Sequence, residues 1–226
     1  MGINVVEKVD GHVKVKHVLI SVSDKSGLET FIPELVRLVP DVRIFSTGGT
    51  FIKISDILKD RAAAHLTRVS EYTGQPETQG GLVKTLDFKI YLGLLTETYN
   101  DSHQADLNRT GGVPIDMVIV NLYPFKATIS REDVTPEQAR GNIDIGGPCM
   151  IRASAKNFLR VSPVVEPDDY PAIISEMEKN KGCTSLALRF DLACKAFAHT
   201  AAYDQAIADY LAACQFKEVD QCYSKA

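Results

Sequence analysis

The stretch VLISVSDKSGLETFIPELVRLVPDVRIFSTGGT, residues 18–50, decides the fold. It opens with an apolar, β-branched run and a polar loop, after which apolar residues recur at positions 28, 31, 32, 35, 36 and 39 with helical spacing. Ser26 and Glu29 have the spacing of a capping box, whereas Pro33 favours a helix that starts near Thr30. The pattern therefore predicts a strand, a loop and a helix.

The end of the same stretch repeats this plan. Residues 42–45 form a short apolar run, residues 46–50 (STGGT) are typical of a tight turn, and the residues after them have the apolar spacing of a helix face. Two successive strand–helix units predict a parallel sheet. We expect further strands at residues 88–95, 117–122 and 161–165, helices that begin at Thr135 and near Pro148, and helical structure throughout residues 185–213.

The bulk composition narrows the classes of protein and partner. The 226-residue chain has no Gly/Ser-rich or Pro-rich linker, so we expect one domain over residues 1–226. A net charge of −4 gives no reason to expect nucleic acid or an acidic membrane as a partner. The five cysteines form no CxxC pair, and the N-terminus lacks the apolar stretch of a signal peptide. We expect a cytoplasmic protein without a metal site.

The glycine turn is a candidate phosphate site. In Ser46-Thr47-Gly48-Gly49-Thr50, glycine would let backbone N–H groups approach an anion at the positive end of a helix, and the hydroxyls would add donors. Ser23 and Lys25 follow the preceding strand, and such loops share one edge of a parallel sheet. A plain connecting turn, an N-capping loop and a solvated lysine explain the same residues, so both interpretations stay open.

Two further segments carry residues that could contact a bound ligand. Lys84 and Thr85 follow Gln79-Gly80-Gly81, a flexible approach that could deliver an ammonium group to a ligand. Asn121 and Tyr123 end the predicted strand 117–122, at the same edge of the sheet. The alternatives are a solvated surface lysine and an aromatic strand end that packs on the core.

Asp144 and Lys156 are candidates for acid–base chemistry. Asp144 lies just before a Gly-Gly helix entry, and Lys156 follows about two to three helical turns later. The structural alternative is that Asp144 caps the helix. His199 has no second histidine or cysteine at ligand spacing, so a hydrogen-bonded helix residue is expected there.

Six segments, taken together and in order, resemble the IMP cyclohydrolase domain of bifunctional purine-biosynthesis enzymes, over residues 16–211. They are SVSDKSG (21–27), FSTGGT (45–50), GGLVKTLDFK (80–89), VIVNLYPF (118–125), NIDIGGPCMIRASAKN (142–157) and FDLACKAFAHTAAYD (190–204).

The resemblance implies a methylglyoxal-synthase-like fold, which is a doubly wound, mostly parallel α/β sheet with helices on both faces. It implies that the reacting end of a purine nucleotide meets Lys84, Tyr123, Asp144 and Lys156. It implies no cofactor and favours a homodimer. The residues that it places around the rest of the nucleotide are Ser23, Lys25, Ser46, Thr47, Gly48, Gly49, Thr50, Thr85, Asn121, Ile145 and Gly146.

The implied reaction is the dehydrative closure of 5-formamidoimidazole-4-carboxamide ribotide to IMP, the last step of purine biosynthesis. The carboxamide nitrogen attacks the formyl carbon, and the carbinolamine then loses water. The hypothesis is that Asp144, held by Lys156, assists deprotonation of the nitrogen, while Lys84 and Tyr123 stabilise the formyl oxygen.

The sequence departs from the family pattern in two respects. Leu82, Asp87 and Phe88 stand where many members have Arg and His-Pro, which exchanges a positive charge for a negative one near the predicted pocket. The larger members also continue into a formyltransferase domain that we do not expect here, so a separate formyltransferase would supply the substrate. The alternatives are methylglyoxal synthase and a non-catalytic purine-nucleotide sensor.

Overall fold

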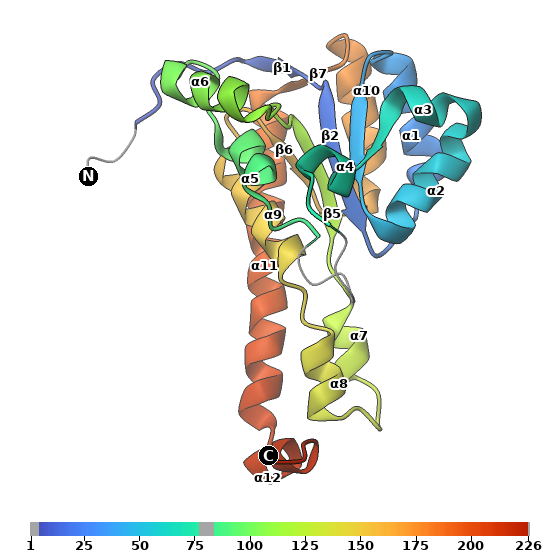
Figure 1. Ribbon diagram of the computed structural model, residues 1–226, viewed down its shortest axis with the longest axis vertical. Coiled ribbons are helices and arrows are strands. Elements are labelled where there is room, and N and C mark those ends of the chain that lie inside the picture. The colour runs from blue at the N-terminus through green and yellow to red at the C-terminus, as the bar shows by residue number, and fades with distance from the viewer. Residues whose placement is uncertain (1–4, 77–83, 226) are drawn as a thin grey trace.

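The computed structural model describes residues 5–76 and 84–225, and a parallel sheet lies at its centre (Figure 1). The sheet has five strands in the order β4-β3-β2-β5-β6, and every neighbouring pair is parallel. The strands are β2 (His17–Val22), β3 (Arg43–Ser46), β4 (Leu66–Arg68), β5 (Met117–Asn121) and β6 (Ser162–Val164). A separate antiparallel pair joins β1 (His12–Lys14) to β7 (Cys183–Ser185). The predicted parallel sheet is confirmed.

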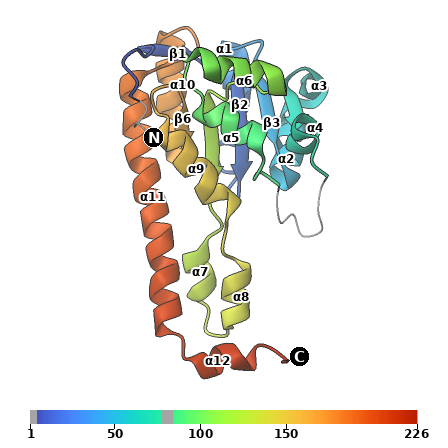
Figure 2. The same cartoon turned by 60° about the vertical axis from the view of Figure 1, so that its left-hand side comes forward.

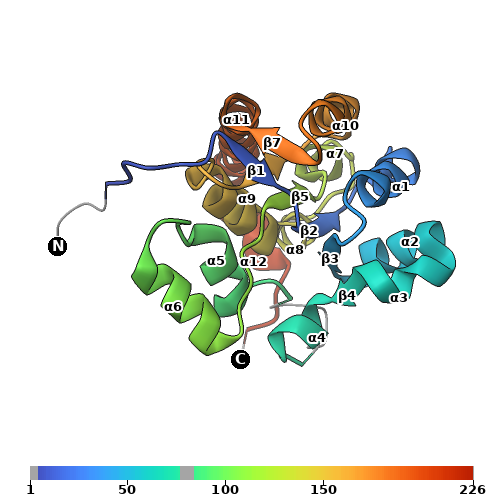
Figure 3. The same cartoon turned by 90° about the horizontal axis from the view of Figure 1, so that it is seen from above.

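Helices cover both faces of the sheet, because alternate strand residues point to opposite sides. Val18 and Ile20 of β2 pack with α1, α2 and α10, whereas Leu19 packs with α5, α9 and α11. Figure 3 shows these two groups on opposite sides of the strands. Their bounds are α1 (Leu28–Leu38), α2 (Gly48–Leu58), α10 (Tyr170–Lys179), α5 (Phe88–Leu95), α9 (Gly146–Lys156) and α11 (Leu186–Ala213). The doubly wound α/β class is therefore confirmed.

Shorter elements complete the chain. They are α3 (Ala62–His65), α4 (Val69–Thr73), α6 (Asp101–Thr110), α7 (Phe125–Ile129), α8 (Pro136–Gly141), α12 (Phe216–Gln221) and the 3₁₀ turns at Lys59–Arg61 and Pro167–Asp169. Figures 1 and 2 show α7 and α8 beyond the carboxyl ends of the strands, beside the second half of α11. Phe125 of α7 meets Tyr203 and Tyr210 of α11 at ring-centroid distances of 6.1 and 6.0 Å.

One predicted strand is a helix. Residues 88–95 form α5, whose first turn is capped by Asp87: its Oδ1 accepts a hydrogen bond of 2.8 Å from the backbone N–H of Lys89. The buried residues Ile90, Gly93 and Leu94 have helical spacing. A short apolar run does not distinguish the two structures by periodicity, so the signal that decides between them is the cap.

The start of α1 also differs from the prediction. The helix begins at Leu28 rather than near Thr30, and Pro33 lies inside it. The N-cap residue Gly27 has φ +75°, and the capping box of Ser26 and Glu29 does not form, because the Ser26 hydroxyl donates to Asp24 at 2.6 Å. Burial of the apolar face of α1 outweighs the backbone hydrogen bond that Pro33 forgoes.

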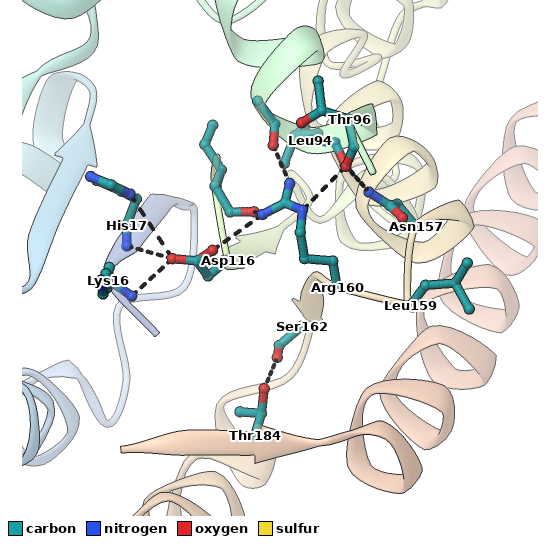
Figure 4. Close-up of polar contacts among 12 residues, drawn as sticks. Lys16, His17, Leu94, Thr96, Asp116, Asn157, Leu159, Arg160, Ser162 and Thr184 are labelled. Atoms are coloured by element: carbon teal, nitrogen blue, oxygen red, sulfur yellow. Dashed lines mark hydrogen bonds and ion pairs between the residues drawn. The ribbon is translucent and has the colours of Figure 1, made fainter. Parts of the chain in front are cut away.

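The amino edge of the sheet holds a buried ion pair (Figure 4). Asp116 precedes β5, and its carboxylate accepts hydrogen bonds from the backbone N–H groups of Lys16 (2.8 Å) and His17 (2.9 Å) and from Arg160 (3.1 Å). Arg160 also donates to the carbonyl groups of Gly93, Thr96 and Ile115. Burial raises the pKa of Asp116, and the charge of Arg160 opposes that rise. This network joins α5, β5 and β6 at the edge opposite the glycine turn.

Candidate functional site

The strand order reverses at one point of the sheet, which marks a candidate ligand site at the carboxyl edge. The chain runs from β2 outward through β3 to β4 and then returns to the other side of β2 as β5, so the order reverses between β2 and β5. In open α/β sheets, ligands bind beyond the carboxyl ends of the strands at such a reversal. The loops that follow β2, β3 and β5 meet there, as predicted for residues 23–25, 46–50 and 121–123.

The glycine turn starts α2 and lies beside two lysines. Gly48, with φ +47°, is the first residue of α2, and the side chain of Thr47 does not cap the helix, which leaves its first N–H groups for another acceptor. A Cβ atom built on Gly48 would lie 3.7 Å from Nζ of Lys84, and one on Gly49 would lie 3.8 Å from Cε of Lys25. A positive helix end between two ammonium groups is suited to an anion.

Two hydroxyls predicted to bind phosphate have other partners. The buried Ser46 donates to the carbonyl of Ile20 at 2.7 Å, and the hydroxyl of Thr50 donates to the carbonyl of Val22 at 3.0 Å. These bonds attach the start of α2 to β2, so a direct ligand role for the Ser46 and Thr50 side chains is not supported.

Ser21 is a candidate site residue that the sequence pattern did not single out. Its hydroxyl lies 3.3 Å from that of Thr47, and both residues are half-buried. The strand register would have revealed this contact. Ile20 of β2 pairs with Ser46 of β3, so the residues that follow them, Ser21 and Thr47, lie side by side.

Asn121 organises the loop after β2. Its side-chain oxygen accepts hydrogen bonds from the backbone N–H groups of Ser23 (2.7 Å) and Asp24 (2.9 Å), and its amide nitrogen donates to the carbonyl of Asp24 (2.8 Å). The carbonyl of Ser23 in turn accepts from Nζ of Lys25 at 3.2 Å. Asn121 therefore positions Lys25. A direct contact between Asn121 and a ligand, as predicted, would have to replace its hydrogen bonds with Ser23 and Asp24.

Thr85 meets the start of α9. A Cβ atom on Gly146 would lie only 2.6 Å from Oγ1 of Thr85, so glycine is needed for the two segments to approach. Ile145, beside it, is 59% exposed and able to contact a ligand. Of the family departures, Asp87 is buried as the cap of α5, which gives its carboxylate a structural partner, and Phe88 is exposed. Leu82, like Gln79, Gly80 and Gly81, lies outside the described residues.

Asp144 is held by the backbone of Gly147 and by Tyr203 of α11. Its Oδ1 accepts a hydrogen bond from the N–H of Gly147 at 3.0 Å, and its N–H donates to the hydroxyl of Tyr203 at 2.7 Å. Burial raises the pKa of Asp144, and the bond from Gly147 opposes the rise. Tyr203 is a second residue that sequence reasoning missed. Tyr123, at the end of β5, is 56% exposed, which leaves its phenol open to a ligand.

Lys156 does not reach Asp144. It is an exposed residue in the last turn of α9, whereas Asp144 precedes the first turn. Because a helix rises about 1.5 Å per residue, the two residues are separated by on the order of 15 Å. The described residues include no ion pair between them, and the prediction that Lys156 holds Asp144 is not supported within one chain.

Other features of the described residues offer less chemistry. A groove of about 730 Å³ lies between α8, the end of α11 and α12, and it is lined by none of the predicted site residues. No group of three or more His, Cys, Asp or Glu residues able to hold a metal ion occurs in residues 5–76 and 84–225. Within the same ranges, no helix is both long and apolar enough to cross a membrane.

Comparisons with known proteins agree with this architecture. Residues 27–149 match the family model of the MGS-like domain, and residues 154–225 match that of the AICARFT/IMPCHase bienzyme. The bifunctional purine biosynthesis protein PurH of Bacillus subtilis (strain 168) is 48% identical over 197 residues, which are 87% of this chain and 37% of that protein. PurH of Synechococcus sp. (strain CC9605) is 47% identical over 194 residues, which are 86% and 36%.

The chain thus spans little more than a third of the length of these relatives. A solved structure, described as the crystal structure of ForH, superposes with a TM-score of 0.71 at 32% identity and covers 85% of this chain and 97% of that one. The family match over residues 27–149, together with the doubly wound sheet and its glycine turn, shows that the chain belongs to the family of MGS-like domains.

Proposed function

We propose that this chain is an IMP cyclohydrolase, which closes 5-formamidoimidazole-4-carboxamide ribotide to IMP in the last step of purine biosynthesis. One observation carries the proposal: an anion site formed by Lys25, Lys84 and the start of α2 shares a sheet edge with a partly buried carboxylate, Asp144. The purine-biosynthesis relatives and the match to the AICARFT/IMPCHase model support this choice of substrate.

The reaction moves protons in two stages and needs no oxidant or reductant. The carboxamide nitrogen first attacks the formyl carbon and loses a proton while the formyl oxygen gains one. The hydroxyl of the resulting carbinolamine then takes up a proton and leaves as water, while the former formamide nitrogen loses its proton and the C=N bond forms. An amide nitrogen is a poor nucleophile, so a base and a fixed near-attack geometry are what the protein must supply.

Asp144 is the base in this proposal. Its raised pKa makes the carboxylate a better proton acceptor than an ordinary aspartate, and Tyr203 and Gly147 fix its position. In the same proposal the phenol of Tyr123, which is exposed, donates a hydrogen bond to the formyl oxygen.

Lys84 could contact either the phosphate or the formyl oxygen of the substrate. In this structure its Nζ lies against Gly48 of the glycine turn, which favours a contact with the phosphate over the formyl oxygen assigned to it from the resemblance. Removing a phosphate contact raises KM, whereas removing a contact made only in the transition state lowers kcat. The kinetics of a Lys84 variant therefore separate the two roles.

The test is conversion of the formamido ribotide to IMP by the purified protein, followed by ultraviolet absorbance, with Lys84→Ala in parallel. Lys53→Ala is the matched control, because Lys53 also belongs to α2 but pairs with Glu29 of α1. We expect turnover by the wild type and by Lys53→Ala, and strongly reduced turnover by Lys84→Ala.

Two outcomes would contradict the proposal. Turnover of dihydroxyacetone phosphate instead of the ribotide would indicate a methylglyoxal synthase. Tight binding of IMP without turnover would indicate a nucleotide sensor.

The cytoplasmic location and the homodimer stay proposals that rest on the resemblance. Light scattering of the purified protein tests whether it is a dimer.

A further inference from the structure

Arg68 ends the strand beside the glycine turn. It is the last residue of β4, and the parallel register pairs it with Ser46, the last residue of β3. Figure 3 shows β4 next to β3 at the side of the sheet where α2 lies. Because Thr47 and Gly48 follow Ser46 directly, Arg68 starts from the same edge as the turn that binds the anion.

The guanidinium group of Arg68 is held over the first turns of α2. Its Cζ lies 4.0 Å from the centroid of the Phe51 ring. Phe51 is the fourth residue of α2, and helical side chains lean toward the helix N-terminus. The stacked arginine is thereby kept near the positive end of α2, where a surface cation would otherwise be repelled.

The charge of Arg68 has no described counter-ion. Among residues 5–76 and 84–225, the half-buried Arg68 side chain makes no ion pair; Glu71 accepts a hydrogen bond of 3.4 Å from its backbone N–H instead. Residues 69–76, which follow β4, contain no Lys, Arg or His. A stacked cation without a described anion, next to a helix N-terminus, is arranged for an anion that arrives from solution.

We propose that Arg68 binds the phosphate of the nucleotide, so that Lys25, Lys84 and Arg68 surround it. The inference rests on the proposed function for the identity of the nucleotide but not for the phosphate itself. A guanidinium group offers two parallel N–H donors to phosphate oxygens, which an ammonium group does not. Arg68 is remote from Asp144 along the sheet edge, so it contributes to binding rather than to ring closure.

The experiment compares Arg68→Met, Arg68→Lys and the control Lys53→Met, which removes a positive charge from α2 outside the site. The dissociation constant of inorganic phosphate is measured by calorimetry at constant ionic strength. For Arg68→Met we expect phosphate binding to weaken about 10- to 30-fold. We expect a smaller loss for Arg68→Lys and no change for Lys53→Met.

With the formamido ribotide, Arg68→Met should raise KM by a similar factor and leave kcat within about two-fold. Unchanged phosphate binding in Arg68→Met would overturn the proposal, and so would a fall in kcat without a rise in KM. If Arg68→Met fails to fold, Phe51→Leu replaces it: loss of the stacking surface should weaken phosphate binding about two- to five-fold. If the wild type binds phosphate but does not convert the ribotide, the proposed function fails while the role of Arg68 is still decided.

Discussion

At the amino edge of the sheet, Asp116 and Arg160 are both buried and each is surrounded by hydrogen-bond partners, whereas at the carboxyl edge Lys25, Lys84 and Arg68 have no ion-pair partner among the described residues. The same sheet thus carries charges that are satisfied by the protein at one edge and charges that are open to a ligand at the other. The first arrangement stabilises the fold, and the second carries the proposed phosphate binding.

The largest effect should come from breaking the amino edge. Arg160→Met removes the partner of Asp116 and leaves a buried carboxylate, which should lower the free energy of unfolding by about 3–5 kcal/mol in urea denaturation. Arg109→Met is the control, because its pair with Asp106 is exposed and should contribute less than about 1 kcal/mol. Equal effects of the two substitutions would show that the buried network is not what stabilises this edge.

At the carboxyl edge, a substitution should reduce activity and leave the stability of the fold unchanged. Lys84→Ala should lower kcat/KM about 100-fold, the value for loss of a charged hydrogen bond to the ligand, with no change in the urea midpoint, because the exposed Lys84 has no described partner in the fold. A fall in the midpoint would instead identify Lys84 as a structural residue and contradict the comparison.

An intermediate effect is expected at Gly147. A Cβ atom there would lie 2.5 Å from Oδ2 of Asp144 and 2.6 Å from Cδ2 of Leu122. Gly147→Ala should therefore displace Asp144, reduce turnover about 10-fold and cost about 1–3 kcal/mol in stability. A Cβ atom on Gly141 would meet nothing within 4 Å, so Gly141→Ala should leave turnover intact. If both variants behave alike, the position of Asp144 is not critical.

The smallest effect concerns the stability cost of Asp144. Because burial raises its pKa in the folded state, Asp144 is protonated in both states at low pH and costs nothing there. As the pH rises, the unfolded chain loses this proton first, and the folded state becomes relatively less stable. Asp144→Asn should abolish turnover yet slightly raise the urea midpoint at neutral pH, with no gain below the ordinary aspartate pKa. An equal rise of the urea midpoint at neutral pH and below the ordinary aspartate pKa would show that the raised pKa of Asp144 is not the cause.

Local signals predicted the elements well. Thr135 and Gln138 form the expected capping box, and the Ala-rich residues 185–213 form α11, with Ser185 as its N-cap. The central strand 117–122 is β5. Among the predicted strands the exception is residues 88–95, which form a helix capped by Asp87, and Gly93 of this helix packs against Val113 and Ile115. Such long-range contacts are not visible in a short apolar run.

The sequence predicted which loops form the candidate site, but not the directions in which their side chains point. The strand ends and the glycine turn predicted that Lys25 and Gly48 share one edge, whereas Lys84 and Asp144 were assigned to the site only by the family resemblance. The sequence does not reveal that the Ser46 hydroxyl turns back to β2 or that Tyr203 reaches Asp144 from α11. Both depend on packing between segments that are distant in the chain.

The bond between Asp144 and Tyr203, which spans 59 residues, also bears on the order of folding. The proposed phosphate site draws on β2, β3, the start of α2, Arg68 and Lys84, all within residues 17–84, whereas Asp144 is fixed only after α11 has docked. Contacts between neighbouring segments form at lower entropic cost than distant ones. A refolding chain should therefore acquire affinity for phosphate before it acquires the proposed ring-closing activity.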